Sequence, residues 1–486
     1  MPGANLSTTS LGFIDLPVEI QTHVLEAFAS SHPASICAVL PTCKHLYKIA
    51  LPLSVRTYES AAGPKNTSQY AQKRSRNLDF LRYITITKPE LAQYVRRINI
   101  KHVSTSLIYR TAPSSKKPLG PESDEIGVYT NMIDASGLSD HVEDWEAVRH
   151  EWLRGLADGL VEQQIGLMFL ACPKIQVLEL GTPLAPRLLP RLIKAAALYG
   201  GSMKAPLLHH LREYCGEPEM PKSLFHFFNI GKEFLQLPQL RTFTCASLSS
   251  SGPNGHLFDE NANPPRSSNV QNLTLLDANI TQEGLSTVIR ACRELKSFRW
   301  TPGDSSFLDM QIKLQDLAQA LSPHRDTLEY LHIDYQDQWR NQEWYVELEG
   351  FFIGTFLREM VSLKTLHIGM EAFTGFTDLW TIPSLYNNFT QEEKVLELKR
   401  VPRLVNHMPP NLESLELYGC TMEILPHIRE LVDLHQTGQR CASLRKVQLR
   451  FNADLVDPSK VSKICDANSS LLDLEFMYDQ TLVEEG

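Results

Sequence analysis

Residues 412–422 read LESLELYGCTM, and they show most clearly a pattern that recurs along the chain. Three leucines, Leu412, Leu415 and Leu417, follow the spacing apolar-x-x-apolar-x-apolar. The last two alternate with polar residues, as a strand with one buried face requires. Nine further windows have this spacing, and each predicts a short strand. They are Val95, Ile98 and Ile100; Ile175, Leu178 and Leu180; Leu240, Phe243 and Cys245; Val270, Leu273 and Leu275; Leu295, Phe298 and Trp300; Leu328, Leu331 and Ile333; Leu363, Leu366 and Ile368; Leu444, Val447 and Leu449; and Leu471, Leu474 and Phe476.

Between several windows the apolar spacing changes to a helical period, which predicts a helix before the next strand. Thr281, followed by Gln282 and Glu283, is a predicted N-cap for the first of these helices. The apolar positions of the four predicted helices are Leu285, Val288, Ile289 and Cys292; Leu314, Leu317, Ala318 and Leu321; Ile353, Phe356, Leu357 and Met360; and Ile424, Leu425, Ile428, Leu431 and Val432.

Strands and helices that alternate in this way resemble the units of a leucine-rich repeat, in which parallel strands line the concave side and helices cover the convex side. Cys420 and Met422 extend the match at residues 412–422 over the consensus L-x-x-L-x-L-x-x-N/C-x-L, with Met in place of the last leucine. Window spacing is irregular: 25 residues separate Val270 from Leu295, whereas 80 separate Val95 from Ile175. We therefore expect an α/β fold, a degenerate leucine-rich-repeat solenoid over residues 91–480, with insertions.

Segments between the windows carry their own signals. Residues 104–126 and 248–269 are rich in Ser, Pro, Gly and Asn, which predicts exposed inserted loops, and the acidic residues 481–486 are predicted to be a frayed tail. A long helical pattern precedes the strand at Ile175, and its tryptophans are expected to pack against the sheet. Its apolar residues are Trp145, Val148, Trp152, Leu156 and Leu160.

The N-terminal residues 11–29 read LGFIDLPVEIQTHVLEAFA, where Leu16-Pro17 directly precedes a predicted helix. A second apolar helix is predicted around Ile36, Val39 and Leu40, and a third in residues 43–53, CKHLYKIALPL. Three short helices bury too little surface to be stable alone. Part of their apolar surface is therefore expected to meet another protein or the following repeats.

This segment resembles the F-box over residues 12–55, because it has the Leu-Pro-x-Glu-Ile start, an inner Val-Leu pair and a Cys/basic/aromatic stretch near its end. Together with the repeats behind a helical linker at residues 56–90, it resembles fungal F-box proteins with leucine-rich repeats. The resemblance implies binding to a Skp-type adaptor, which docks on a cullin. Position by position, Leu16 and Pro17 would form the adaptor-facing loop, Glu19 and Ile20 would open the contacting helix, Val24 and Leu25 would lie inside or at the interface, and Tyr47 would replace a frequent tryptophan.

The function implied is that of a non-catalytic substrate receptor of an SCF-type ubiquitin ligase, whose repeats bind a client protein. Candidate client contacts are the polar positions inside the strand windows, above all Arg299, His332, His367, Glu416 and Gln448. Because neighbouring strands lie ~4.8 Å apart, His332 and His367 are expected side by side if their repeats are adjacent. Alternatives stay open: solvated polar residues on an exposed sheet, an ordinary helix start at Leu16-Pro17, or a scaffold that binds proteins without ubiquitin transfer.

Composition and short motifs bear on the other classes of function, partner and cellular compartment. The net charge is -9 with no long Lys/Arg block, so nucleic acid is not an expected partner. Nine cysteines without a CxxC pair suggest reduced thiols and neither a disulfide framework nor a zinc site. We expect no catalytic residue, metal or cofactor, because hydrolase, metalloprotease and nucleotide-binding motifs are missing and the His209-His210 pair is typical of a helix face. Neither a signal sequence nor an apolar run of membrane length is evident, so the cytoplasm or nucleus is expected.

Overall fold

A computed structural model of the chain describes the residues that define its strands and helices. The described residues are 12–60, 75–101, 120–181, 187–200, 204, 206–217, 225–226, 231–249, 264–303, 312–334, 352–374, 403–421, 424–438, 441–452 and 472–479. They form two compact units, Met1–Arg212 and Glu213–Gly486, which are described separately below. Of the predicted loops and tail, residues 104–119, 250–263 and 481–486 lie outside this part of the chain.

The fold is α/β, and in the described residues its twelve main strands follow one another in chain order, parallel wherever their register is defined. All ten predicted strands are confirmed. The first unit holds β1 (Thr57–Ser60), β2 (Arg97–Ile100) and β3 (Val177–Gly181). The second holds β4 (Glu213–Glu217), β6 (Thr242–Ala246), β8 (Asn272–Ala278), β9 (Ser297–Pro302), β10 (Tyr330–Ile333), β11 (Thr365–Gly369), β12 (Ser414–Cys420), β13 (Lys446–Asn452) and β14 (Asp473–Asp479), with a small separate pair, β5 (Phe225–His226) and β7 (Leu248–Ser249).

The strands of the second unit are aligned by their apolar windows. The third apolar residue of each window pairs in register with that of the next strand, so the same position stacks from β6 to β14. These residues are Cys245, Leu275, Trp300, Ile333, Ile368, Leu417, Leu449 and Phe476, and all but Phe476 are fully buried. A one-residue slip would turn the whole set to the opposite face, so burial of this row fixes the register.

Two strands of the main sheet, β1 and β4, were not predicted, and neither was the separate pair β5 and β7. The windows of β1 and β4, with Val55 and Tyr58 in one and Leu211 and Tyr214 in the other, have buried residues at the first two positions but Ser60 or Gly216 at the third. The prediction of a helical linker over residues 56–90 is therefore wrong at residues 57–60, because these form β1, and the parallel sheet begins before residue 91, where the repeats were predicted to start. Helical segments follow only later, in α3 (Arg76–Arg82), η4 (Tyr83–Thr87) and η5 (Pro89–Tyr94).

The residues before β4 are also not helical, contrary to the prediction for His209 and His210. They lie in a turn in which Leu208 has φ 50°, a left-handed conformation that ends any helix.

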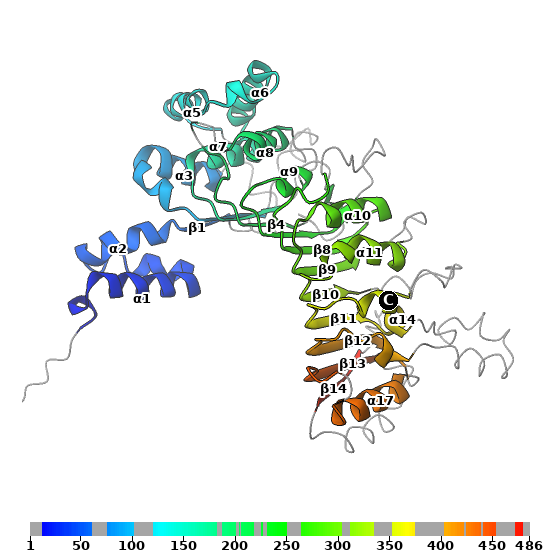
Figure 1. Cartoon of the computed structure of the whole chain (residues 1–486). Helices are drawn as coiled ribbons and strands as arrows, with labels where there is room; N and C mark the ends of the chain where they lie inside the picture. The colour runs from blue at the N-terminus through cyan, green and yellow to red at the C-terminus, as the bar shows by residue number, and fades with distance from the viewer. Residues whose placement is uncertain are drawn as a thin grey trace, which may run out of the picture. The chain divides into compact units, whose positions relative to one another are not determined.

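The predicted repeat helices are present in the second unit, along one side of its strands (Figure 1). Thr281 is the N-cap of α10, and its hydroxyl accepts a hydrogen bond of 3.1 Å from the amide of Gly284. The helical segments of the second unit are α9 (Gly231–Leu235), α10 (Gln282–Ala291), α11 (Leu314–Leu321), η8 (Ser322–His324), α13 (Gly354–Leu357), α14 (Met370–Thr374), η10 (Leu404–Asn406) and α17 (Ile424–Gln436). We refer to the side of the sheet opposite the predicted repeat helices as the open face.

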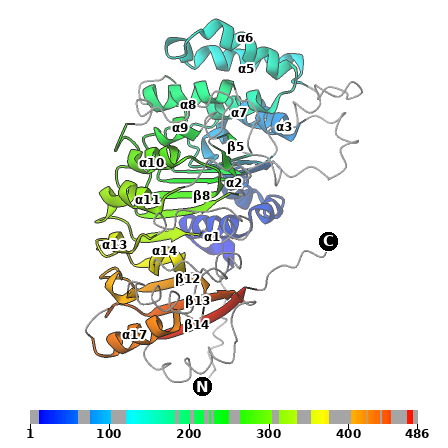
Figure 2. The same ribbon diagram turned by 90° about the vertical axis from the view of Figure 1, so that its right-hand side faces the viewer.

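In the first unit, the long predicted helix is divided into α6 (Trp145–Ala157) and α7 (Val161–Ala171) at Gly159, whose φ is 73°. Trp152 is buried and donates its indole N–H to the carbonyl of Gln163, 3.0 Å away, so it packs on α7 and not, as predicted, on the sheet. Figure 2 shows α5 (Ser123–Ala135) and α6 as a layer beside α7 and α8 (Leu188–Tyr199), with η6 (Leu138–Asp140) between α5 and α6 in sequence.

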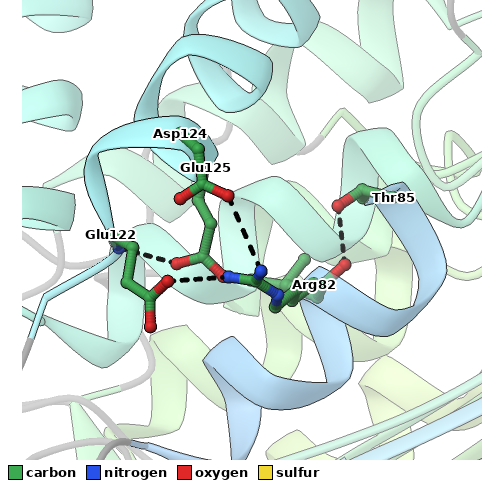
Figure 3. A network of polar contacts seen from close by, with 6 residues as sticks. Arg82, Thr85, Glu122, Asp124 and Glu125 are labelled. Atoms are coloured by element: carbon green, nitrogen blue, oxygen red, sulfur yellow. Dashed lines mark hydrogen bonds and ion pairs between the residues drawn. The ribbon is translucent and has the colours of Figure 1, made fainter. Parts of the chain in front are cut away.

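The start of α5 corrects the predicted loop 104–126, because the helix begins at Ser123. Glu125 is fully buried, accepts the amide of Glu122 at 2.7 Å and lies 3.1 Å from the guanidinium of Arg82. Figure 3 shows Arg82, at the end of α3, facing the acidic first turn of α5; it is also 3.0 Å from Glu122 and 3.6 Å from Asp124. Carboxylates are stabilised near a helix N-terminus by the helix dipole. Both the guanidinium of Arg82 and the dipole of α5 therefore stabilise the acidic residues of its first turn.

Tyr214→Phe is expected to raise the free energy of unfolding by about 1 kcal/mol. The ring of Tyr214 stacks on Phe234 at 3.9 Å between centroids, but its buried hydroxyl has no hydrogen-bond partner in the described part of the chain. Phenylalanine keeps the ring contact and removes the desolvated hydroxyl. Tyr58→Phe is the matched control: its hydroxyl donates to Asn77 at 2.6 Å, so this variant is expected to lose stability. Urea unfolding of both variants gives the comparison, and equal effects would contradict it.

Candidate functional site

The N-terminal module, residues 12–55, contains η1 (Phe13–Asp15), α1 (Val18–Ser31), η2 (Pro33–Ala38) and α2 (Lys44–Ser54). Two of the three predicted helices are confirmed as α-helices, and the middle one is a short 3-10 helix. The core of the module is formed by Leu25, Ala29, Ile36 and Ala50, with Phe13, Val39, Leu40, Leu46, Ile49 and Leu53 packed partly against it.

Helix α1 exposes a stripe of large apolar side chains. Ile20, Val24 and Phe28 are spaced four residues apart, and 46%, 47% and 38% of their surfaces are exposed. Residues at this spacing share one helix face. Among the described residues, six of the eleven exposed large hydrophobic side chains belong to this module, including Val18 and Tyr47, so apolar surface is concentrated here. Such concentration is typical of a protein-binding surface.

The structure separates the predicted adaptor contacts into two groups. Pro17, Glu19, Ile20, Val24 and Tyr47 are exposed, and Leu16 is partly exposed. Leu25 is only 5% exposed and belongs to the core, so of the two positions expected for it, inside the module or at the interface, it occupies the first. The cause is its position on α1, one turn from buried Ala29 and on the side that packs against the other helices of the module.

Gln21 is a further residue of this site that the sequence did not suggest. It is 2% exposed, and its amide N–H groups donate to the carbonyls of Ile14 at 3.1 Å and Leu16 at 2.7 Å. Its amide oxygen accepts from Nε2 of His45 in α2 at 2.8 Å. Gln21 therefore holds the backbone around Leu16-Pro17 in place between α1 and α2.

The module continues directly into the sheet, because only Val55 and Arg56 separate α2 from β1. The backbone carbonyl of Arg56 accepts the amides of Arg96 and Arg97 at 2.8 and 3.0 Å. Its guanidinium lies 3.3 Å from Glu26 of α1. A single residue thus contacts both α1 and the start of β2.

On the open face, the predicted client contacts form one continuous row. Arg299, His332, His367, Glu416 and Gln448 are register partners on β9 to β13, and Glu475 extends the row onto β14. The predicted neighbourhood of the two histidines is confirmed, with ring centroids 5.3 Å apart. We call these six residues the polar row.

Glu416 is the central partner in the polar row. It is 4% exposed, and its carboxylate lies 3.1 Å from Nδ1 of His367 and 2.5 Å from Nε of Arg450 on the neighbouring strand. The next pair consists of Gln448 and Glu475, in which the amide of Gln448 donates to the carboxylate of Glu475. The ammonium group of Lys446 lies 3.0 Å from the carboxylate of Glu475. From β11 to β14 the members of the row are therefore paired laterally.

His332 is 7% exposed, and its Nδ1 shares a hydrogen bond of 3.2 Å with the hydroxyl of Tyr330. Its Nε2 has no hydrogen-bond partner among the described residues. Burial, with the nearby charges of Arg299, His367 and Arg450, lowers the pKa of His332 to about 3. Burial also lowers the pKa of His367, against the opposing effect of Glu416. At neutral pH, the row therefore contains a neutral His332.

These shifts predict acid lability. His332 has a folded pKa of about 3 against an ordinary value of 6.5, so the unfolded chain takes up the proton first as the pH falls. Its contribution to stability is complete above pH 6.5 and declines toward pH 3; at pH 4.5 the loss is about 2 to 3 kcal/mol. Urea unfolding at pH 7 and at pH 4.5 measures this difference in the free energy of unfolding. His332→Gln is expected to reduce the difference, whereas the exposed control His23→Gln is not.

No protein-family model matches the chain, and no curated protein matches it. In the part of the chain that the structure describes, no group of three or more His, Cys, Asp or Glu side chains is placed to hold a metal ion. None of the helices described here combines the length and apolar character needed to cross a membrane.

Proposed function

We propose that this chain is the substrate-recognition subunit of an SCF-type cullin-RING ubiquitin ligase. Its N-terminal module binds a Skp-type adaptor, and the open face of its repeats binds a client protein. The observation that carries the proposal is the exposed stripe of Ile20, Val24 and Phe28, which lies on a helix whose neighbouring face is already packed.

The mechanism needs no chemistry from this chain. The adaptor docks on the cullin, which carries the ubiquitin-charged enzyme, and the repeats hold the client nearby. Tethering raises the effective concentration of client lysines at that enzyme. Arg56 supports this role, because its contacts with Glu26 of α1 and with the start of β2 limit movement between the module and the first strands.

Reconstitution of the complex tests the proposal. The full chain is mixed with purified adaptor and cullin, and the three proteins are expected to elute together. Leu16→Ala combined with Pro17→Ala is expected to prevent this. Crosslinking mass spectrometry of the protein from cells with the proteasome blocked is expected to recover adaptor, cullin and accumulated clients. Adaptor without cullin would favour the ubiquitin-independent scaffold, and recovery of neither would end both readings of the module.

A further inference from the structure

Pairing along the polar row stops at its β9–β10 end. Arg299 is exposed and forms no ion pair with a described residue, and His332 next to it leaves Nε2 without a hydrogen-bond partner there. Every later member, from His367 to Glu475, has a lateral partner. Arg299 and His332 are thus the two adjacent positions of the row with unused hydrogen-bonding capacity.

Both groups, the guanidinium of Arg299 and Nε2 of His332, can act as hydrogen-bond donors. A guanidinium group only donates hydrogen bonds. When the hydroxyl of Tyr330 donates to Nδ1 of His332, the single hydrogen of the neutral ring is on Nε2, which is then a donor too. Register partners on neighbouring strands are ~4.8 Å apart, a separation that one anionic group with two or three oxygens can bridge.

We propose that Arg299 and His332 recognise an anionic group of the client, either a carboxylate or a phosphate. This inference rests on the proposed function and names the chemistry of its client site. Exposed Arg299 makes the first contact. Nε2 of His332 is covered by neighbouring rings, among them Tyr418 with a centroid 5.6 Å away, so one of these rings must move before the anion reaches it.

Three labelled peptides test the proposal. Each has eight residues, in which Gly alternates with Glu, phosphoserine or Gln, and fluorescence anisotropy measures its binding to the full chain. At least one acidic peptide is expected to bind about tenfold tighter than the Gln peptide, and Arg299→Gln is expected to remove that difference. The tighter of the two acidic peptides identifies the source of the anion.

Arg358→Gln is the matched control, because Arg358 is also exposed but follows α13 on the helical side. It is expected to keep the preference for acidic peptides. Equal binding of all three peptides, or equal losses in the two arginine variants, would overturn the proposal. Adaptor capture is measured on the same preparations: retained capture without anion preference rejects this inference alone, whereas lost capture with intact preference rejects the ligase assignment.

Discussion

Ile20→Asp combined with Val24→Asp is expected to weaken adaptor capture at least about a hundredfold without changing the thermal stability of the chain. Both side chains are almost half exposed, so the free protein loses little packing. In the complex, each carboxylate would be buried in an apolar interface without a partner, which is costly. Biolayer interferometry with immobilised adaptor measures the affinity, and calorimetry measures the stability.

Two control variants distinguish an effect on the exposed stripe of α1 from an effect on the core of the N-terminal module. His23→Asp places one carboxylate on α1 outside the stripe, where the side chain of His23 is 77% exposed, and is expected to leave capture intact. Leu25→Ala removes buried volume and is expected to destabilise the N-terminal module by about 2 to 4 kcal/mol. Normal capture by the double aspartate variant would show that the stripe is not the docking surface.

Strands were the most predictable part of this fold. Each strand of the main sheet from β2 to β13 buries the apolar positions of its window against its neighbours, so the pattern survives changes in the length of the intervening segments. The strands β1 and β4 were not predicted, because Ser60 and Gly216 occupy the third position of their windows, where the pattern has an apolar residue.

The N-terminal site was less predictable, because α1 carries two adjacent stripes suited to burial. The all-apolar stripe of Ile20, Val24 and Phe28 is exposed, whereas the stripe with Gln21 and Leu25 is buried. Helical periodicity cannot choose between them, since the choice depends on where α2 packs. A buried glutamine is acceptable because its amide is satisfied by backbone carbonyls and a histidine.

In the second unit, the sequence identified the row but not its pairing. His332 and His367 were expected as neighbours because their windows are consecutive. The contact of Arg450 with Glu416 could not be anticipated, because Arg450 lies outside the row and the register between β12 and β13 shifts after Leu417. Local pattern therefore predicts which side chains share a face, whereas their partners depend on tertiary detail.

Gln21→Leu is expected to lower the free energy of unfolding of the N-terminal module by roughly 2 kcal/mol and to weaken adaptor binding about tenfold. Leucine preserves buried volume but leaves the carbonyls of Ile14 and Leu16 and the ring of His45 without their partner. Hydrogen exchange of residues 12–20 is expected to accelerate. Thr22→Ala is the control, since among the described residues its hydroxyl donates to the carbonyl of Val18 within the same helix.

This effect differs in kind from that of the aspartate variant. Gln21 is 2% exposed, so it acts by ordering the backbone at Leu16-Pro17 before the adaptor arrives, and its loss adds an ordering cost to binding. Weaker binding must therefore accompany faster exchange in residues 12–20. Weaker binding with unchanged exchange would mean that Gln21 touches the adaptor, and unchanged binding with faster exchange would mean that this backbone lies outside the interface.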